Sequence, residues 1–127
     1  MDKIRAGEFC WNELATPDVK AAKEFYSKLL GWQFTEHDTG DMIYTFINTQ
    51  AKGEEAIGGI WGIPKERNEI PPHWMSYIAV DNVAETLKQA TDLGATVKMP
   101  VTPVGNIGLF AIIADPTGAH IAFWEYK

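Results

Sequence analysis

The sequence is short of several features, and each shortage excludes a class of protein. With one cysteine, Cys10, it cannot form an internal disulfide, which favours a reducing cytoplasmic location. Its 11 basic residues against 17 acidic ones give a net charge of -6, which disfavours nucleic acid and anionic membranes as partners. No apolar run approaches the length needed to span a bilayer, and the opening MDKIRAGEF lacks a signal-peptide core. We therefore predict a soluble cytoplasmic protein.

The features that are present are those of one globular domain. The chain has 127 residues, of which 46% are hydrophobic and 22% charged. This length and composition are enough to build a single core and argue against extended disorder. We predict one domain over residues 1–127.

The first structured stretch is FCWNELATPDVKAAKEFY, from Phe9 to Tyr26. Residues two apart share a face of a strand, so Trp11 and Glu13 lie on the face opposite Leu14. The run stops at Pro17, and Thr16 is the expected cap of a helix whose first position is Pro17. Apolar residues then recur at helical spacing up to Gly31, which ends the helix. These are Val19, Ala22, Phe25, Tyr26, Leu29 and Leu30.

The rest of the chain repeats this order of elements. Alternating and turn-bounded stretches predict seven further strands and one further helix, Val83–Leu93. The strands are Trp32–His37, Met42–Thr49, Ala56–Ile63, His73–Val80, Thr96–Val101, Asn106–Ala114 and His120–Tyr126. Between the third and fourth of these lies PKERNEIPP, residues 64–72, which has linker character.

Each half therefore reads strand, helix, strand, strand, strand. Superposing the halves matches Trp11 with Met75, Gly31 with Gly94 and Trp61 with Trp124. The predicted fold class is α+β, with two tandem βαβββ modules forming curved mixed sheets around a central cleft. Module 1 covers about 8–63 and module 2 about 73–126, joined by 64–72. Each helix is expected on the convex side of its sheet.

The order of these elements and three of their segments resemble a known family. The segments PDVKAAKEFYSKLLGW, AVDNVAETLKQATDLGA and DPTGAHIAFWE are similar to the glyoxalase, bleomycin-resistance and extradiol dioxygenase group, the vicinal oxygen chelate superfamily. The resemblance covers nearly the whole chain. It is greatest to glyoxalase-like proteins whose first strand reads W-x-E-L-x-T-P-D and whose second module opens with His-Trp, here His73 and Trp74. Since such modules pair within or between chains, it also implies a homodimer.

The resemblance implies a divalent metal held by four side chains on the inner faces of the modules. The matching positions here are Trp11, Gly59, Met75 and Ala122, and none is a ligand for a hard divalent cation. A shift of one or two residues restores only part of a site, through Trp74 or Cys10, or through His73 and Glu13. We therefore predict no metal and no other cofactor.

Glu13 and His73 are the candidate catalytic pair. A carboxylate on the inner face of a strand is costly to bury without a partner, so Glu13 meets either a ligand or a structural cation such as Arg5 or Lys98. His73 is either a general acid or base near neutral pH or a solvated residue at the start of its strand. The sequence leaves both pairs of alternatives open.

Two functions are compatible with these residues. The first is a small-molecule-binding protein that uses its cleft for a flat or cationic ligand, as resistance proteins of the superfamily do by sequestration. The second is a glyoxalase-type lyase or isomerase, or a dioxygenase-related enzyme, that uses Glu13 and His73, so catalysis is left open. The missing ligands favour the first. The predicted ligand-binding residues are Trp11, Glu13, Tyr44, Trp61, Met75, Tyr77 and Phe110.

Overall fold

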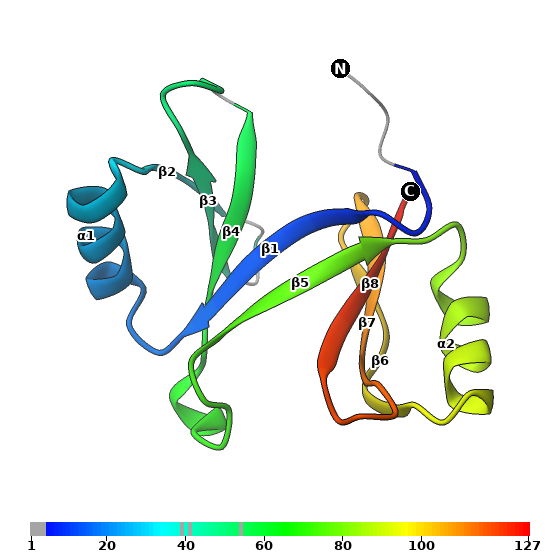
Figure 1. The fold of residues 1–127 in the computed structure, drawn as a ribbon. Coiled ribbons are helices and arrows are strands. Elements are labelled where there is room, and N and C mark those ends of the chain that lie inside the picture. Colours follow the sequence, from blue (N-terminus) through cyan, green and yellow to red (C-terminus); the bar gives the residue numbers. More distant parts are fainter. Residues whose placement is uncertain (1–4, 39, 41, 54) are drawn as a thin grey trace. The chain divides into compact units, whose positions relative to one another are not determined.

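The computed structural model describes residues 5–38, 40, 42–53 and 55–127. The chain falls into two compact units, one of residues 11–74 and one of residues 1–10 with 75–127 (Figure 1). Each unit consists of strands and one long helix, which confirms the predicted α+β class and the repeat of βαβββ. The N-terminal residues 5–10 belong with the second half of the chain, through hydrogen bonds such as Gly7 N to Ala79 O (2.8 Å).

The unit of residues 11–74 has one helix and a four-stranded mixed sheet. Its strands lie in the order β2-β3-β4-β1, with β1 parallel to β4 and the other pairs antiparallel. A short 3₁₀ helix, η1, follows β4. The elements are β1 (Phe9–Thr16, which enters this unit at Trp11), α1 (Val19–Leu30), β2 (Gln33–Asp38), β3 (Ile43–Asn48), β4 (Ala56–Gly62) and η1 (Lys65–Arg67).

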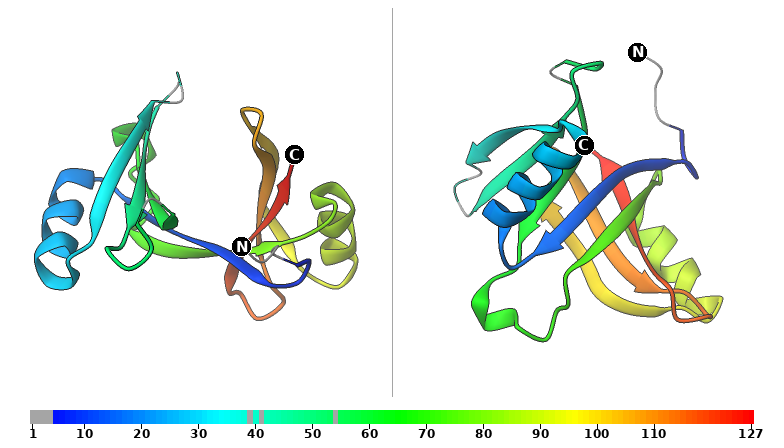
Figure 2. Two further views of the ribbon diagram at one scale, coloured as in Figure 1. Left: turned by 90° about the horizontal axis from the view of Figure 1, so that it is seen from above. Right: turned by 60° about the vertical axis from the view of Figure 1, so that its left-hand side comes forward.

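The other unit repeats this arrangement. Its strand order is β5-β8-β7-β6, again with the first strand parallel to the last, β5 to β8. Figure 2 shows α2 packed beside the strands of this unit. The elements are β5 (His73–Ala79), α2 (Val83–Asp92), β6 (Thr96–Val104), β7 (Gly108–Ala114) and β8 (His120–Tyr126).

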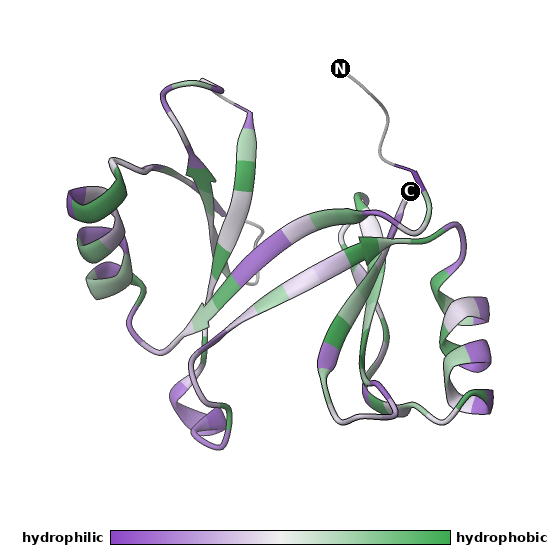
Figure 3. Ribbon diagram, in the orientation of Figure 1, coloured by the Kyte–Doolittle hydropathy of each residue, from purple (hydrophilic) through white to green (hydrophobic). Residues whose placement is uncertain are grey.

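The core of the 11–74 unit lies between its sheet and α1. Leu14, Ile47 and Ile60 are buried there, and Val19, Ala22 and Tyr26 pack against them from the helix side. This burial follows from strand alternation, because Leu14 is paired with Ile60 and points away from the face that carries Glu13. Figure 3 shows that both helices contain hydrophobic and hydrophilic residues. Among the described residues, no helix is long and apolar enough to cross a membrane.

The start of α1 differs from the prediction. Asp18, not Thr16, is the N-cap, and its Oδ1 accepts a hydrogen bond from Ala21 N at 3.0 Å. Thr16 Oγ1 instead accepts from Asp18 N at 3.2 Å, which places Pro17 before the helix. Both threonine and aspartate can cap a helix, and the geometry of this turn selects Asp18. The predicted end at Gly31 is confirmed, with φ of 72° in the left-handed region.

Two further features were not foreseen from the sequence. Phe25, Leu29 and Leu30 recur at the predicted helical spacing, yet they are 57%, 62% and 54% exposed, because the sheet contacts only the side of the helix around Tyr26. Strand β6 was predicted to stop at Val101 and continues to Val104. Its place at the edge of the sheet and its irregular register explain how it tolerates prolines.

Candidate functional site

The face of the 11–74 sheet opposite α1 carries the candidate site. Glu13 is paired with Gly59, Gly59 with Phe46, and His37 with Tyr44. Residues paired across neighbouring strands point to the same side of a sheet, so these side chains share one face with Trp11. Four strands therefore contribute to a single surface.

A chain of hydrogen bonds connects three of these side chains. Trp11 Nε1 donates to Tyr44 Oη at 3.0 Å, and Tyr44 Oη donates to Glu13 Oε2 at 2.7 Å. The direction is fixed by chemistry, because an indole N–H can only donate and the phenol proton is then directed to the carboxylate. All three side chains are half-buried. The result is a carboxylate held in place by an aromatic hydroxyl.

Ring contacts hold the same residues from the side. Phe46 packs edge to face against Tyr44, with centroids 5.1 Å apart at 68°, and against Trp11, at 6.1 Å and 76°. The His37 ring also contacts Phe46, with ring centroids 6.3 Å apart and an interplanar angle of 63°. Such arrangements are the preferred geometry of aromatic pairs and restrict the rotamers of each ring. The surface is therefore aromatic and pre-organised.

Gly59 is required beneath Tyr44. A Cβ at this position would overlap the Oη, Cζ and Cε2 atoms of the Tyr44 ring. The phenol therefore lies where any side chain on residue 59 would begin. This close approach is a reason for glycine that is independent of backbone conformation.

The predicted site residues fall into both units. In the 11–74 unit, Trp11, Glu13 and Tyr44 are in direct contact, and Trp61 shares their face through its pairing with Ala15. Phe46 was not predicted, although its spacing from Tyr44 on the same strand was a usable signal. In the other unit, Met75 and Tyr77 are each 7% exposed, and the Tyr77 and Phe110 rings lie 6.4 Å apart.

The structure gives the two candidate catalytic residues different partners. Glu13 accepts a hydrogen bond from Tyr44, a partner that the sequence reasoning did not name. His73 Nδ1 lies 2.7 Å from Pro71 O, which holds the ring at the start of β5. The proton-transfer pair of Glu13 and His73 stays a prediction.

The four residues that the sequence analysis matched to the superfamily's metal positions offer no ligand set for a divalent cation. In one unit, the indole N–H of Trp11 already donates to Tyr44, and the volume next to Gly59 is taken by that phenol. In the other, Met75 offers only a thioether and Ala122 a methyl group with no exposure. Among the described residues, no three His, Cys, Asp or Glu side chains are grouped as metal ligands.

Comparison with known proteins identifies the class. The profile of the Glyoxalase/Bleomycin resistance protein/Dioxygenase superfamily matches residues 9–123. The chain belongs to this superfamily.

Particular relatives follow from sequence comparison. The chain is 35% identical over 126 residues to the putative glyoxylase CFP32 of Mycobacterium tuberculosis, covering 97% of this chain and 47% of that protein. It is 30% identical over 135 residues to the anthracycline biosynthesis protein DnrV of Streptomyces peucetius, covering 98% and 49%. The chain thus spans about half the length of the curated relatives that it matches.

Solved structures share the fold at low sequence identity. Methylmalonyl-CoA epimerase from Mycobacterium tuberculosis superposes with a TM-score of 0.67 at 14% identity, covering 100% of this chain and 93% of that one. The hypothetical protein BH1468 from Bacillus halodurans gives a TM-score of 0.70 at 14% identity, covering 97% and 96%. At these identities the likeness establishes the fold alone.

Proposed function

We propose that this chain is a metal-independent small-molecule-binding protein of the superfamily, and that the Trp11–Tyr44–Glu13 face is its principal binding surface. The observation that carries the proposal is the hydrogen-bonded chain from Trp11 through Tyr44 to Glu13. It presents a carboxylate among aromatic rings. Trp61 is a proposed lining residue of this surface, and Met75, Tyr77 and Phe110 in the other unit remain proposed ligand-binding residues.

A flat, cationic aromatic molecule suits this surface. The rings of Trp11, Tyr44 and Phe46 offer stacking area, and the Glu13 carboxylate attracts positive charge. The relative DnrV is named for anthracycline biosynthesis, and anthracyclines are planar polycyclic compounds. That name supports the proposed shape of the ligand.

A catalytic function is the second candidate. The relative CFP32 is named a putative glyoxylase, and a carboxylate such as Glu13, which accepts a hydrogen bond from the Tyr44 hydroxyl, can serve as a general base. In this version Glu13 and His73 transfer protons in a glyoxalase-type lyase or isomerase, or in a dioxygenase-related reaction. The test uses the adduct of methylglyoxal and glutathione as substrate. If the wild type turns it over and both Glu13→Gln and His73→Gln lose this activity, the catalytic function is favoured over simple binding.

Binding of two planar probes tests the main proposal. Proflavine is a planar cation at neutral pH and acridine is its largely uncharged parent, so their difference reports on the carboxylate. We expect Glu13→Gln to keep the fold and to weaken proflavine binding by about 1–3 kcal/mol while leaving acridine binding nearly unchanged. Fluorescence titration measures both affinities.

Glu36→Gln is the matched control. Glu36 is paired with Thr45, which places it on the opposite face of the same sheet, and it has a salt bridge to Lys23. This variant removes the same charge and should leave proflavine affinity unchanged. A Glu13→Gln protein with a lowered melting temperature but unaltered affinity would make Glu13 a structural residue and refute the proposal.

A further inference from the structure

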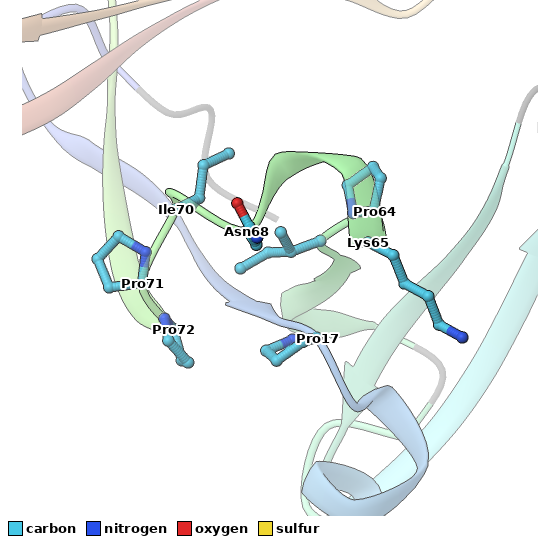
Figure 4. A pocket seen from close by; sticks show the side chains of 8 residues that line it. Pro17, Pro64, Lys65, Asn68, Ile70, Pro71 and Pro72 are labelled. Atoms are coloured by element: carbon cyan, nitrogen blue, oxygen red, sulfur yellow. The ribbon is translucent and has the colours of Figure 1, made fainter.

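A cavity in the 11–74 unit is lined by residues other than Trp11, Glu13 and Tyr44. It has a volume of about 380 Å³, within the range of small-molecule sites. Figure 4 shows it between the end of β1 and the segment that follows β4. It is lined by Pro17, Ile63, Pro64, Lys65, Asn68, Ile70, Pro71 and Pro72.

The walls of this cavity are mostly apolar, and four of the residues that line it are prolines. The prolines carry no N–H group and have a fixed φ, so they neither donate hydrogen bonds nor need ordering when a ligand binds. Several backbone groups of the segment are already used. Pro64 O accepts from Arg67 N at 2.9 Å, and Pro71 O lies 2.7 Å from His73 Nδ1.

The polar groups that remain define the ligand's charge. Lys65 is the charged residue of the lining, and among the described residues it forms no ion pair. Its neighbour Arg67 is occupied by Glu69 at 2.6 Å. Figure 4 shows the Lys65 side chain extending outward from the edge of the cavity. Its flexible stem can bring the ammonium over the opening.

We propose that this cavity binds a small apolar carboxylate. The hydrocarbon part lies against the prolines, Ile63 and Ile70, and the carboxylate meets the Lys65 ammonium at the opening. The side-chain amide of Asn68, which also lines the cavity, offers a second hydrogen-bond donor to the carboxylate. The opposite charge of the ligand distinguishes this site from the cation-binding face proposed above.

Titration with 2-naphthoate, followed by amide NMR, tests this proposal. We expect the amide signals of Asn68 and Ile70 to shift in the wild-type protein. Lys65→Gln should weaken binding about fivefold, and the uncharged analogue 2-naphthamide should bind the wild type more weakly by a similar factor. Lys52→Gln, which removes a lysine that does not line the cavity, should bind 2-naphthoate like the wild type.

Ile70→Trp provides a second variant, in which the larger side chain fills the cavity. It should abolish the shifts at Asn68 while leaving the spectrum of the folded protein otherwise intact. The proposal is wrong if 2-naphthoate produces no shifts at millimolar concentration, if the shifts occur around Trp11 and Tyr44, or if Lys65→Gln binds like the wild type.

Discussion

At the scale of single residues, the close approach of Tyr44 to Gly59 shapes the candidate site. The position that would carry a ligand on β4 has no room for a side chain while the phenol occupies it. The same phenol orients the Glu13 carboxylate. One aromatic side chain therefore both fills the space beside Gly59 and holds the carboxylate of Glu13.

This contact predicts a strong coupling between the two residues. Gly59→Ala should lower the free energy of unfolding by about 1–3 kcal/mol, because the added methyl group displaces the Tyr44 ring. In a Tyr44→Ala background the same change should cost much less. Chemical denaturation of the four proteins gives the coupling energy.

Gly62→Ala is the control for general effects of alanine in β4. Its added Cβ would lie 3.3 Å from Val19 Cγ2, a tight contact that a small shift relieves. We expect a smaller loss than for Gly59→Ala. Equal costs of Gly59→Ala with and without the Tyr44 ring would contradict the steric account.

At the scale of elements, the turn between β7 and β8 is held by one carboxylate. Asp115 Oδ1 accepts from Thr117 Oγ1 at 2.6 Å, from Thr117 N at 2.8 Å and from Ala119 N at 3.0 Å. These bonds, the Thr117 hydroxyl first, hold the pKa of the Asp115 carboxyl below its ordinary value of 3.8. These hydrogen bonds give the Asp-Pro-Thr-Gly turn a structural role.

The depressed pKa predicts how this turn responds to acid. Because the folded pKa lies below the unfolded one, the stabilising contribution is present above the unfolded pKa and is lost as the pH falls through the folded value. Asp115→Asn keeps an acceptor but removes the charge. We expect it to melt below the wild type at pH 6 and the difference to shrink below about pH 3.8. A difference that grows in acid would refute this assignment.

At the scale of the whole molecule, the unsuitable ligand positions predict metal independence. With Trp11, Gly59, Met75 and Ala122 at those positions, the purified protein should contain no stoichiometric metal, and a chelator should leave its melting temperature unchanged. Elemental analysis and thermal melts measure this. A zinc, nickel, iron or manganese ion at one per chain would contradict the alignment.

The homodimer stays a prediction that rests on the family resemblance. The βαβββ modules of such proteins pair within a chain or between chains. We expect light scattering to give a dimer mass. A monomer mass at micromolar and higher concentrations would rule this out.

Local patterns in the sequence were enough for the architecture and for part of the site. Alternation by twos placed Trp11 and Glu13 on the face opposite Leu14, helical spacing and Gly31 defined α1, and the repeat predicted two βαβββ modules. These features depend on residues a few positions apart, whose geometry is set by the period of a strand or helix.

Only the tertiary structure decided which distant residues meet. Tyr44 reaches Glu13 and Trp11 across Gly59 because of the register of β3, β4 and β1, and no local pattern contains that register. The exposure of Leu29 was likewise decided by how much of α1 the sheet contacts. Contacts between strands more than 30 residues apart depend on the packing of the whole unit, so a carboxylate visible in the sequence acquired its phenol partner only in the fold.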